Sequence, residues 1–169
     1  ALMLGLKNYM TKNGFRLAHL GLSGGIDSAL TLAILADTIE SENIHSFYLP
    51  SKFSSNDSKK DAESLSKNVG IKTSEISIEI LRNTILKHLN PIFKKYKEDV
   101  TEENIPSRLR GIILMALSNK LDSLLVTTGN KSELAVGYST LYGDMCGGYS
   151  LLKDVYKTDV FELCRWRNK

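Results

Sequence analysis

Cysteine and long apolar runs are scarce in this sequence, and their scarcity excludes several classes of protein. Cys146 and Cys164 are the only cysteines among 169 residues, too few for a disulfide framework and wrongly spaced for a Cys/His metal motif. No apolar run approaches the roughly 20 residues that span a bilayer, and no signal peptide is visible. We therefore expect a cytoplasmic protein with no membrane partner.

Charge of one sign is scarce as well. The 22 basic and 19 acidic residues leave a net charge of +3, whereas nucleic-acid binding usually needs a concentrated basic face. The short basic run over 94–97 is expected to face solvent. The apolar share of 42% and the charged share of 24% are ordinary for a globular chain. The sequence thus argues against nucleic acid as a partner.

Both ends of the sequence look cut. It opens at Ala1 within a helical pattern and closes at Lys169 at the tail of another. The length suits one domain over residues 1–169. We expect this domain to be part of a longer polypeptide, truncated at both ends.

Strand and helix patterns alternate along the chain, which predicts an α/β fold with a doubly wound parallel sheet flanked by helices. Right-handed crossovers bring the carboxyl ends of such strands to one edge of the sheet, and ligands bind beyond that edge. From the apolar runs and helical periodicities we expect strands at 17–22, 44–49, 72–78 and 124–128, and helices at 2–12, 28–38, 56–69, 80–96, 106–121 and 158–167.

Three residues suggest where particular helices begin or break. Asn56 is the expected N-cap of its helix. Pro91 is expected to break the helix over 80–96. Pro106 suits the first turn of the helix that follows, because its missing N–H has no partner there in any case.

A glycine-rich loop follows the first expected strand, where residues 21–28 read Gly-Leu-Ser-Gly-Gly-Ile-Asp-Ser. Adjacent glycines let backbone N–H groups turn toward an anion, and the next helix presents its unpaired amides to the same anion. Asp27 would repel a phosphate unless a hard cation such as Mg²⁺ lies between them. The alternative is an ordinary strand-to-helix turn, and the loop matches neither the Walker A nor the G-x-G-x-x-G pattern.

The loop resembles the SGGxDS loop of the ATP pyrophosphatase superfamily, which grips the β- and γ-phosphates of ATP. Residues 127–133 read Thr-Thr-Gly-Asn-Lys-Ser-Glu, and 137–144 end in Tyr-Gly-Asp. Residues 104–110 carry an Asn-x-x-x-Arg-x-Arg stretch, and 152–158 form a lysine-bearing loop before a helix. These blocks, in this order, resemble those of the NAD synthetases, and their residues are most similar to the synthetase domain of the glutamine-dependent form.

The resemblance implies the adenine-nucleotide α-hydrolase-like fold and a ligase that forms a C–N bond. The implied reaction is the ATP-dependent amidation of deamido-NAD to NAD through an acyl-adenylate, with release of AMP and pyrophosphate. ATP, deamido-NAD and ammonia are the implied partners, and Mg²⁺ is the implied metal. An amidase domain ahead of this one would draw the ammonia from glutamine, and the enzyme would be a homodimer or a higher homo-oligomer.

The resemblance also implies roles for individual residues. Asp27 and Lys157 are the implied catalytic residues, and Asp27 and Glu133 the implied metal ligands. Asn104, Arg108 and Glu133 would face deamido-NAD. ATP contacts are implied for Gly21, Leu22, Ser23, Gly24, Gly25, Ile26, Asp27, Ser28 and Thr128.

Several of these assignments have alternatives. Arg108 and Arg110 stand two apart and cannot share a helix face, so one faces the ligand and the other solvent or a partner; we favour Arg108 for the ligand. Glu133 could instead be a helix-cap carboxylate, and its position suits either the metal or the dinucleotide. Leu141 and Gly148 stand where shorter, ammonia-only relatives carry a lysine and an aspartate that touch the substrate.

Two other functions compete with NAD synthesis. A tRNA-thiolating enzyme uses the same loop but usually needs a reactive cysteine pair or a large basic surface, and this sequence has neither. A non-catalytic module for ATP or AMP would bind without turnover. The three histidines and both cysteines have no neighbours in the sequence that indicate acid–base or redox chemistry, so we expect them to be structural, with both cysteines buried.

Overall fold

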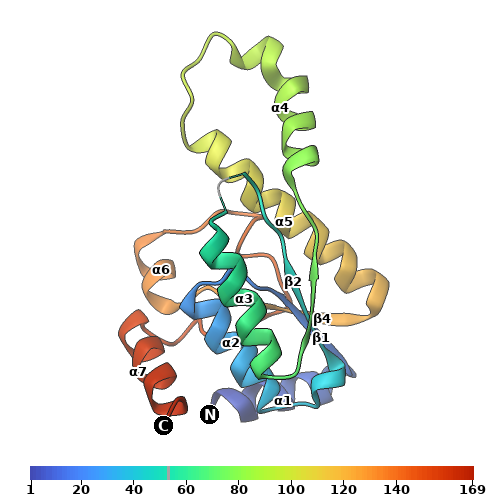
Figure 1. Ribbon diagram of the computed structural model, residues 1–169, viewed down its shortest axis with the longest axis vertical. Helices are drawn as coiled ribbons and strands as arrows, with labels where there is room; N and C mark the ends of the chain where they lie inside the picture. The colour runs from blue at the N-terminus through green and yellow to red at the C-terminus, as the bar shows by residue number, and fades with distance from the viewer. Residues whose placement is uncertain (53) are drawn as a thin grey trace.

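Five strands form a parallel sheet in the computed structural model, which describes residues 1–52 and 54–169 (Figure 1). The strand order is β3-β2-β1-β4-β5, and each neighbouring pair is parallel. The chain steps outward from β1 to β3 and then adds β4 and β5 on the other side of β1. This is a doubly wound sheet, as the sequence predicted. The strands are β1 (Leu17–Gly21), β2 (Ile44–Tyr48), β3 (Lys72–Glu75), β4 (Ser123–Thr127) and β5 (Tyr149–Ser150).

Helices cover both faces of the sheet. Helices α2 and α3 pack against β1, β2 and β3, and α7 packs beside α2. Helix α5 packs against β1 and β4 on the opposite face. Helix α4 and the start of α5 project from the sheet as a helical arm (Figure 1). The helices are α1 (Leu2–Asn13), α2 (Ile26–Ala36), α3 (Asn56–Asn68), α4 (Glu79–Phe93), α5 (Val100–Leu121), α6 (Lys131–Val136) and α7 (Lys157–Arg167), with a 3₁₀ turn, η1 (Ser41–Asn43).

Alternate residues of the central strands enter two separate apolar layers. Leu20, Leu124 and Val126 pack with buried side chains of α1, α2 and α7. Leu125 points to the other face and packs with Leu114 of α5. Burying one leucine-sized side chain contributes roughly 1.5–3 kcal/mol. The two layers together therefore hold β1 and β4 in register and fix the edge where both strands end.

Two helices begin differently from the prediction. Ser55, rather than Asn56, is the N-cap of α3, because its hydroxyl accepts a hydrogen bond from the backbone N–H of Ser58 at 3.0 Å. Helix α5 begins at Val100, so Pro106 lies inside the helix and not in its first turn. Both expectations were therefore wrong in their boundaries, although each helix exists.

A capping box explains the early start of α5. The Asp99 carboxylate accepts a backbone hydrogen bond in the first turn, and the Glu102 carboxylate accepts one from the N–H of Asp99 at 2.9 Å. This reciprocal cap satisfies amides that would otherwise lack partners and starts the helix ahead of Pro106, which costs one internal hydrogen bond. Pro91 likewise lies inside α4, which continues to Phe93 without the predicted break.

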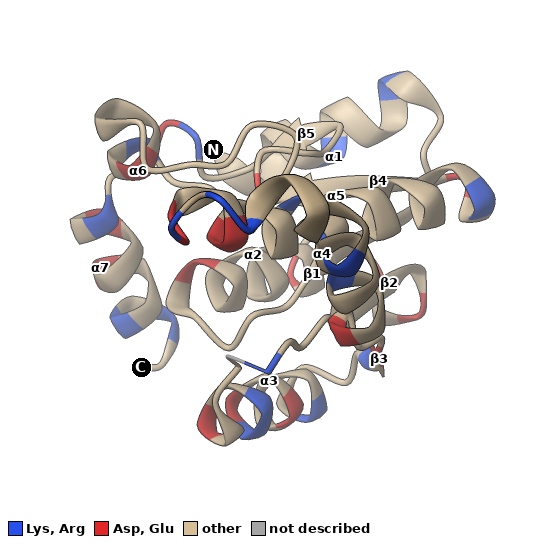
Figure 2. Cartoon of the chain, turned by 90° about the horizontal axis from the view of Figure 1, so that it is seen from above, with Lys and Arg blue, Asp and Glu red and all other residues tan. Residues whose placement is uncertain are grey.

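Charged side chains of both signs are mixed over the elements seen from above (Figure 2), in keeping with the small net charge. Within the described ranges, 1–52 and 54–169, no helix has the length and apolar character of a membrane span. Cys146 and Cys164 are free thiols and only partly buried. The expectation that both cysteines are buried was therefore wrong.

His19 is a wholly buried link between β1, β4 and α5. Its exposed fraction is 0%, and its Nε2 lies 3.0 Å from the carbonyl oxygen of Leu114 while its Nδ1 lies 2.8 Å from Oγ of Ser123. Because a carbonyl only accepts, Nε2 carries the hydrogen, and the Ser123 hydroxyl donates to Nδ1. Burial lowers the pKa of His19, which favours the neutral ring in the folded protein.

This lowered pKa predicts a specific loss of stability in acid. The unfolded chain takes up a proton at His19 as the pH falls through 6.5, the ordinary pKa of a histidine, and the folded chain does so only at lower pH. Stability from this residue is therefore present above pH 6.5 and is lost as the pH falls toward the folded-state pKa. Substitution His19→Gln should lower the free energy of unfolding at pH 7.5, and urea titrations should show the deficit shrinking by at most about 1.4 kcal/mol per pH unit below pH 6.5. A deficit that is constant from pH 7.5 to 5 would contradict the assignment.

Candidate functional site

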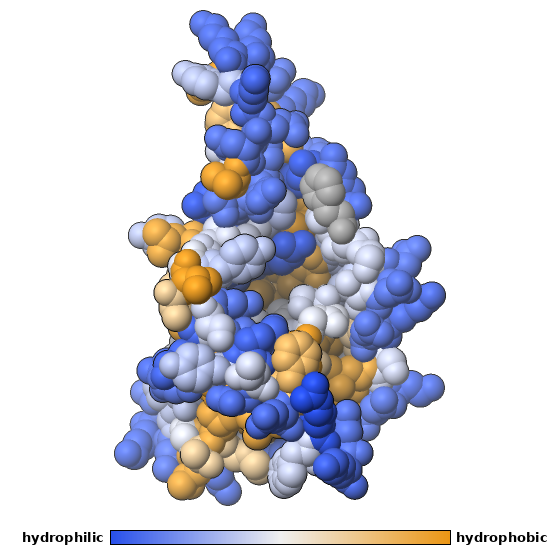
Figure 3. Space-filling view, turned by 90° about the vertical axis from the view of Figure 1, so that its left-hand side faces the viewer, coloured by the Kyte–Doolittle hydropathy of each residue, from blue (hydrophilic) through white to orange (hydrophobic). Residues whose placement is uncertain are grey.

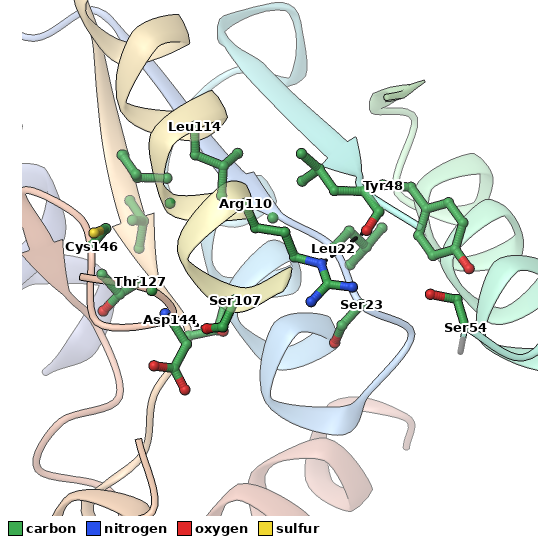
Figure 4. A pocket seen from close by; sticks show the side chains of 17 residues that line it. Leu22, Ser23, Tyr48, Ser54, Ser107, Arg110, Leu114, Thr127, Asp144 and Cys146 are labelled. Atoms are coloured by element: carbon green, nitrogen blue, oxygen red, sulfur yellow. Dashed lines mark hydrogen bonds between the residues drawn. The ribbon is translucent and has the colours of Figure 1, made fainter. Parts of the chain in front are cut away.

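A cavity of about 400 Å³ lies at the carboxyl edge of the sheet, where β1, β2 and β4 end (Figure 4). Parallel strands were expected to place their ligand site at this edge, and the structure brings the glycine loop and the exit of β4 together there. Figure 3 shows the molecule hollowed below the helical arm. The cavity lining includes Gly21, Leu22, Ser23, Leu49, Arg110, Thr127, Thr128 and Asp144.

The glycine loop has a backbone shape that depends on Gly24. Its φ is +83°, and a Cβ there would lie 2.4 Å from the carbonyl oxygen of Ser58 in α3. Ser28 closes the loop, since its hydroxyl donates to the carbonyl of Gly25 at 2.8 Å and accepts from the N–H of Ser23 at 3.2 Å. Gly25 is the N-cap of α2 and offers no side-chain cap. The first turn of α2 therefore has no side-chain cap, and the binding of an anion by its amides stays a prediction.

Asp27 stands in the first turn of α2 and receives two donors from distant parts of the chain. The side-chain Nδ2 of Asn130 donates to its Oδ1 at 3.0 Å, and Nζ of Lys157 forms an ion pair with its Oδ2. The Asp27 side chain is 16% exposed and that of Lys157 is 38% exposed. The two residues given catalytic roles from the sequence are therefore in direct contact. Asn130, which received no role, completes the group.

Glu133 has the helix-cap geometry that was weighed against a ligand role. Its Oε2 accepts from the backbone N–H of Asn130 at 3.1 Å, and its own N–H donates to Oδ1 of Asn130 at 3.0 Å. This capping box begins α6. Glu133 also lines a second cavity, of about 50 Å³, next to the exit of β4. A contact with metal or dinucleotide stays a prediction.

The side chains around Asp27 fit one kind of metal site. Among the residues that the structure describes, no three His, Cys, Asp or Glu side chains form a cluster that could cage an ion. Mg²⁺ seldom uses such cages, because it is usually held by one or two carboxylates together with substrate phosphates and water. A single carboxylate beside free helix amides therefore suits Mg²⁺ that arrives with a nucleotide.

The two arginines of α5 point to different places, as their spacing required. Arg110 lines the cavity, and its Nε donates to the carbonyl oxygen of Leu49 at 2.9 Å (Figure 4). Burial lowers the pKa of the Arg110 guanidinium. Arg108 is exposed, and its Nε donates to the carbonyl oxygen of Leu141 at 3.2 Å. The arginine within reach of the cavity is thus Arg110, which the sequence alone did not single out.

Segment 137–148 follows α6 and lies along α5. Its Thr140 hydroxyl donates to Oδ1 of Asn104 at 2.8 Å, and the N–H of Asp144 donates to Oγ of Ser107 at 3.1 Å. A Cβ at Gly148 would lie 2.8 Å from the side chain of Leu124. Asn104 therefore helps to hold this segment, and a side chain at Gly148 would require Leu124 to shift.

Known sequences resemble this chain over its whole length. The NAD synthase family matches residues 1–169. The glutamine-dependent NAD(+) synthetase of Xanthomonas campestris pv. campestris (strain 8004) is 54% identical over 99% of this chain, and that of Thermotoga maritima is 49% identical over 99%. The chain spans only 30% and 29% of these two relatives.

Solved structures agree with the sequences. The glutamine-dependent NAD+ synthetase from Acinetobacter baumannii, in complex with ADP, superposes with a TM-score of 0.97 at 47% identity, covering 99% of this chain and 32% of that one. The NH3-dependent NAD synthetase from Campylobacter jejuni gives a TM-score of 0.90 at 26% identity, covering 99% and 71%. The match over the whole of residues 1–169, with these relatives, shows that the chain belongs to the NAD synthase family.

Proposed function

We propose that this domain, within its full-length protein, amidates deamido-NAD to NAD at the expense of ATP. An oxygen of the nicotinate carboxylate attacks the α-phosphorus of ATP, the bond to the bridging oxygen breaks, and pyrophosphate leaves. Ammonia then attacks the acyl carbon of the adenylate and loses a proton, and AMP leaves with the electrons of the C–O bond. The first step needs no general base, because the attacking carboxylate is already ionised at neutral pH.

One observation carries this proposal: a carboxylate inside a phosphate-type loop, held by a lysine and an amide from two distant segments. A plain anion site has no use for Asp27, since a carboxylate repels phosphate. A nucleotide that brings its own Mg²⁺ gives Asp27 a role, because the carboxylate can bind the metal. The complex of the Acinetobacter relative with ADP supports a nucleotide at this fold. Glycine-loop amides, Asp27 and Lys157 then surround the triphosphate.

Each residue has a separate task in this proposal. Lys157, on a flexible stem, offsets charge on the transferred phosphorus. Thr128 lies against the adenosine part, and the loop amides of Gly24 and Gly25 hold the departing pyrophosphate. Bound Mg²⁺ would neutralise phosphate charge and polarise the P–O bonds. Catalysis is otherwise positioning of two bound substrates.

The source of ammonia extends the proposal beyond this domain. The curated relatives are glutamine-dependent and are about three times as long as the matched region. We propose that an amidase portion of the full-length protein supplies ammonia from glutamine and that the enzyme acts as a homodimer or a higher homo-oligomer in the cytoplasm.

Isotope exchange between ATP and pyrophosphate tests the function directly. The full-length protein should catalyse exchange with deamido-NAD and should fail with other carboxylic acids and with tRNA. Exchange that depends on tRNA would favour a thiolating enzyme. ATP binding without exchange for any acid would favour a non-catalytic module.

Substitution Asp27→Asn in the full-length protein should lower Mg²⁺-dependent exchange roughly 10²- to 10³-fold, because the amide cannot replace an anionic ligand. The melting temperature should change little, since Lys157 can turn to solvent. Asp37→Asn is a matched control, because it breaks another carboxylate pair between α2 and α7, that of Asp37 with Arg167 at 2.8 Å. Equal rates for Asp27→Asn and the control would remove the metal role of Asp27.

Two arginine variants separate the ligand-facing residue from its neighbour. Loss of one charge-assisted contact costs roughly 1.5–3 kcal/mol, so a substrate contact by Arg108 predicts that Arg108→Ala raises the KM for deamido-NAD about 10- to 150-fold over that for ATP. Arg110→Ala, at the cavity wall beside the glycine loop, should instead raise the KM for ATP. Steady-state kinetics on both variants decide, and equal effects of Arg108→Ala on both substrates would mean that this arginine only holds segment 137–148.

A further inference from the structure

Asn130 is fully buried, with an exposed fraction of 0%, and its one amide group serves two partners. Its Oδ1 accepts from the backbone N–H of Glu133 at 3.0 Å and so caps α6. Its Nδ2 donates to Oδ1 of Asp27 at 3.0 Å. Since the backbone N–H can only donate and the carboxylate can only accept, one orientation of the amide satisfies both. The residue thus joins the start of α6 to the glycine loop.

Helix capping alone does not explain an asparagine at this position. Ser, Thr, Asp and Asn all make effective N-caps, so the bond to Glu133 would tolerate any of them. The bond to Asp27 needs a donor that reaches across to another segment. Aspartate would place a second carboxylate against Asp27 in a buried place, where like charges repel strongly. A serine or threonine hydroxyl could accept and donate only from a single atom on a shorter side chain, whereas the amide places an acceptor and a donor on two separate atoms.

The orientation of the Asp27 carboxylate depends on such a donor. The terminal torsion of aspartate is broad and roughly two-fold, so the intrinsic preference of the side chain does not fix the plane of its oxygens. Lys157 meets the other oxygen from a long flexible stem and can follow the carboxylate if it rotates. The Asn130 side chain is buried and held by the first turn of α6. The Asn130 amide is therefore the partner that can fix the orientation of the Asp27 carboxylate.

We propose that Asn130 is a positioning residue that fixes the Asp27 carboxylate in the orientation required to receive a divalent cation with the nucleotide. The proposal rests on the proposed ATP site and adds a residue to it. Both polar atoms of the Asn130 amide already have protein partners, so the residue acts through Asp27. Without this donor, the Asp27 carboxylate loses its fixed orientation.

The test compares Asn130→Ser and Asn130→Thr with the wild type in the full-length protein. Serine and threonine keep a capping oxygen for α6 and lack the amide that reaches Asp27. Affinity for Mn²⁺, measured by electron paramagnetic resonance with α,β-methylene-ATP bound, should fall about 10-fold, the scale of one hydrogen bond to a charged group. Affinity for the analogue without metal should stay within about three-fold of wild type.

Gly137→Ala is the matched control, because it weakens α6 at its other end. Gly137 has a φ of +70° with open space around it, so alanine there strains the backbone and leaves Asn130 and Asp27 alone. It should lower the melting temperature and leave Mn²⁺ affinity unchanged. A loss of Mn²⁺ affinity in Gly137→Ala equal to that in Asn130→Ser would show that intact α6 suffices and would overturn the proposal.

The remaining outcomes also support or overturn the positioning role of Asn130. Wild-type Mn²⁺ affinity in both Asn130 variants overturns the positioning role, and so does failure of both variants to fold, because the amide would then be needed for the fold itself and not for the orientation of Asp27. The Mn²⁺ measurement requires no turnover. A wild type that binds Mn²⁺ with the analogue but catalyses no exchange with deamido-NAD would contradict the proposed reaction and leave the role of Asn130 readable.

Discussion

The site is organised by the burial of one carboxylate. Asp27 lies in the first turn of α2, and a carboxylate that is mostly withdrawn from water costs several kcal/mol unless it is paired and hydrogen-bonded. Asn130 and Lys157, which are 103 and 130 residues away in the chain, provide the amide and the ammonium. The loop after β4 and the start of α7 therefore have to lie where Asp27 is.

Two ion pairs join α7 to α2, one near each end of α7. Asp27, in the first turn of α2, pairs with Lys157. Asp37, the C-cap of α2, pairs with Arg167. The partly exposed Asp37–Arg167 pair contributes at most about 1 kcal/mol. Val160 of α7 packs into the core and adds apolar burial to this contact. The two ion pairs lie near opposite ends of α7 and favour the observed alignment of the helices.

The sheet order explains why this junction lies beside a cavity. Strands β1 and β4 are neighbours although about 100 residues separate them, and the chain winds in opposite directions from them. The loops that leave their carboxyl ends therefore diverge and leave a crevice, as in other doubly wound sheets. The glycine loop borders one side, the exit of β4 the other, and α5 with Arg110 closes the wall.

The sequence predicted the parts of the fold that repeat over many residues. Strands β1, β2 and β4 and the glycine loop were predicted because apolar runs and adjacent glycines are local signals. Helix α6 and strand β5 span six and two residues, which is too short for periodicity to show. The predicted start of α5 was placed at Pro106, and the Asp99–Glu102 capping box was overlooked, although both of its residues can be read from the sequence.

The contacts that define the site were harder to predict, because they join distant segments. Asn130 lay inside a recognised block, and only the fold shows that its amide meets Asp27. The choice between Arg108 and Arg110 depended on the rotation of α5, which is set by its packing on β4. Helical spacing separates the two arginines, and tertiary contacts decide which of them reaches the cavity.

Segment 137–148 has a different mechanical character from the rest of the site. Hydrogen bonds to Asn104, Ser107 and Arg108 hold it on α5, and Leu141 and Tyr142 stay exposed. Segments with few buried apolar contacts open locally at a free-energy cost well below that of global unfolding. Exposed amides of this segment should thus exchange with solvent sooner than those of β1 and β4, so this wall of the cavity should yield to an entering ligand more readily than the sheet beneath it.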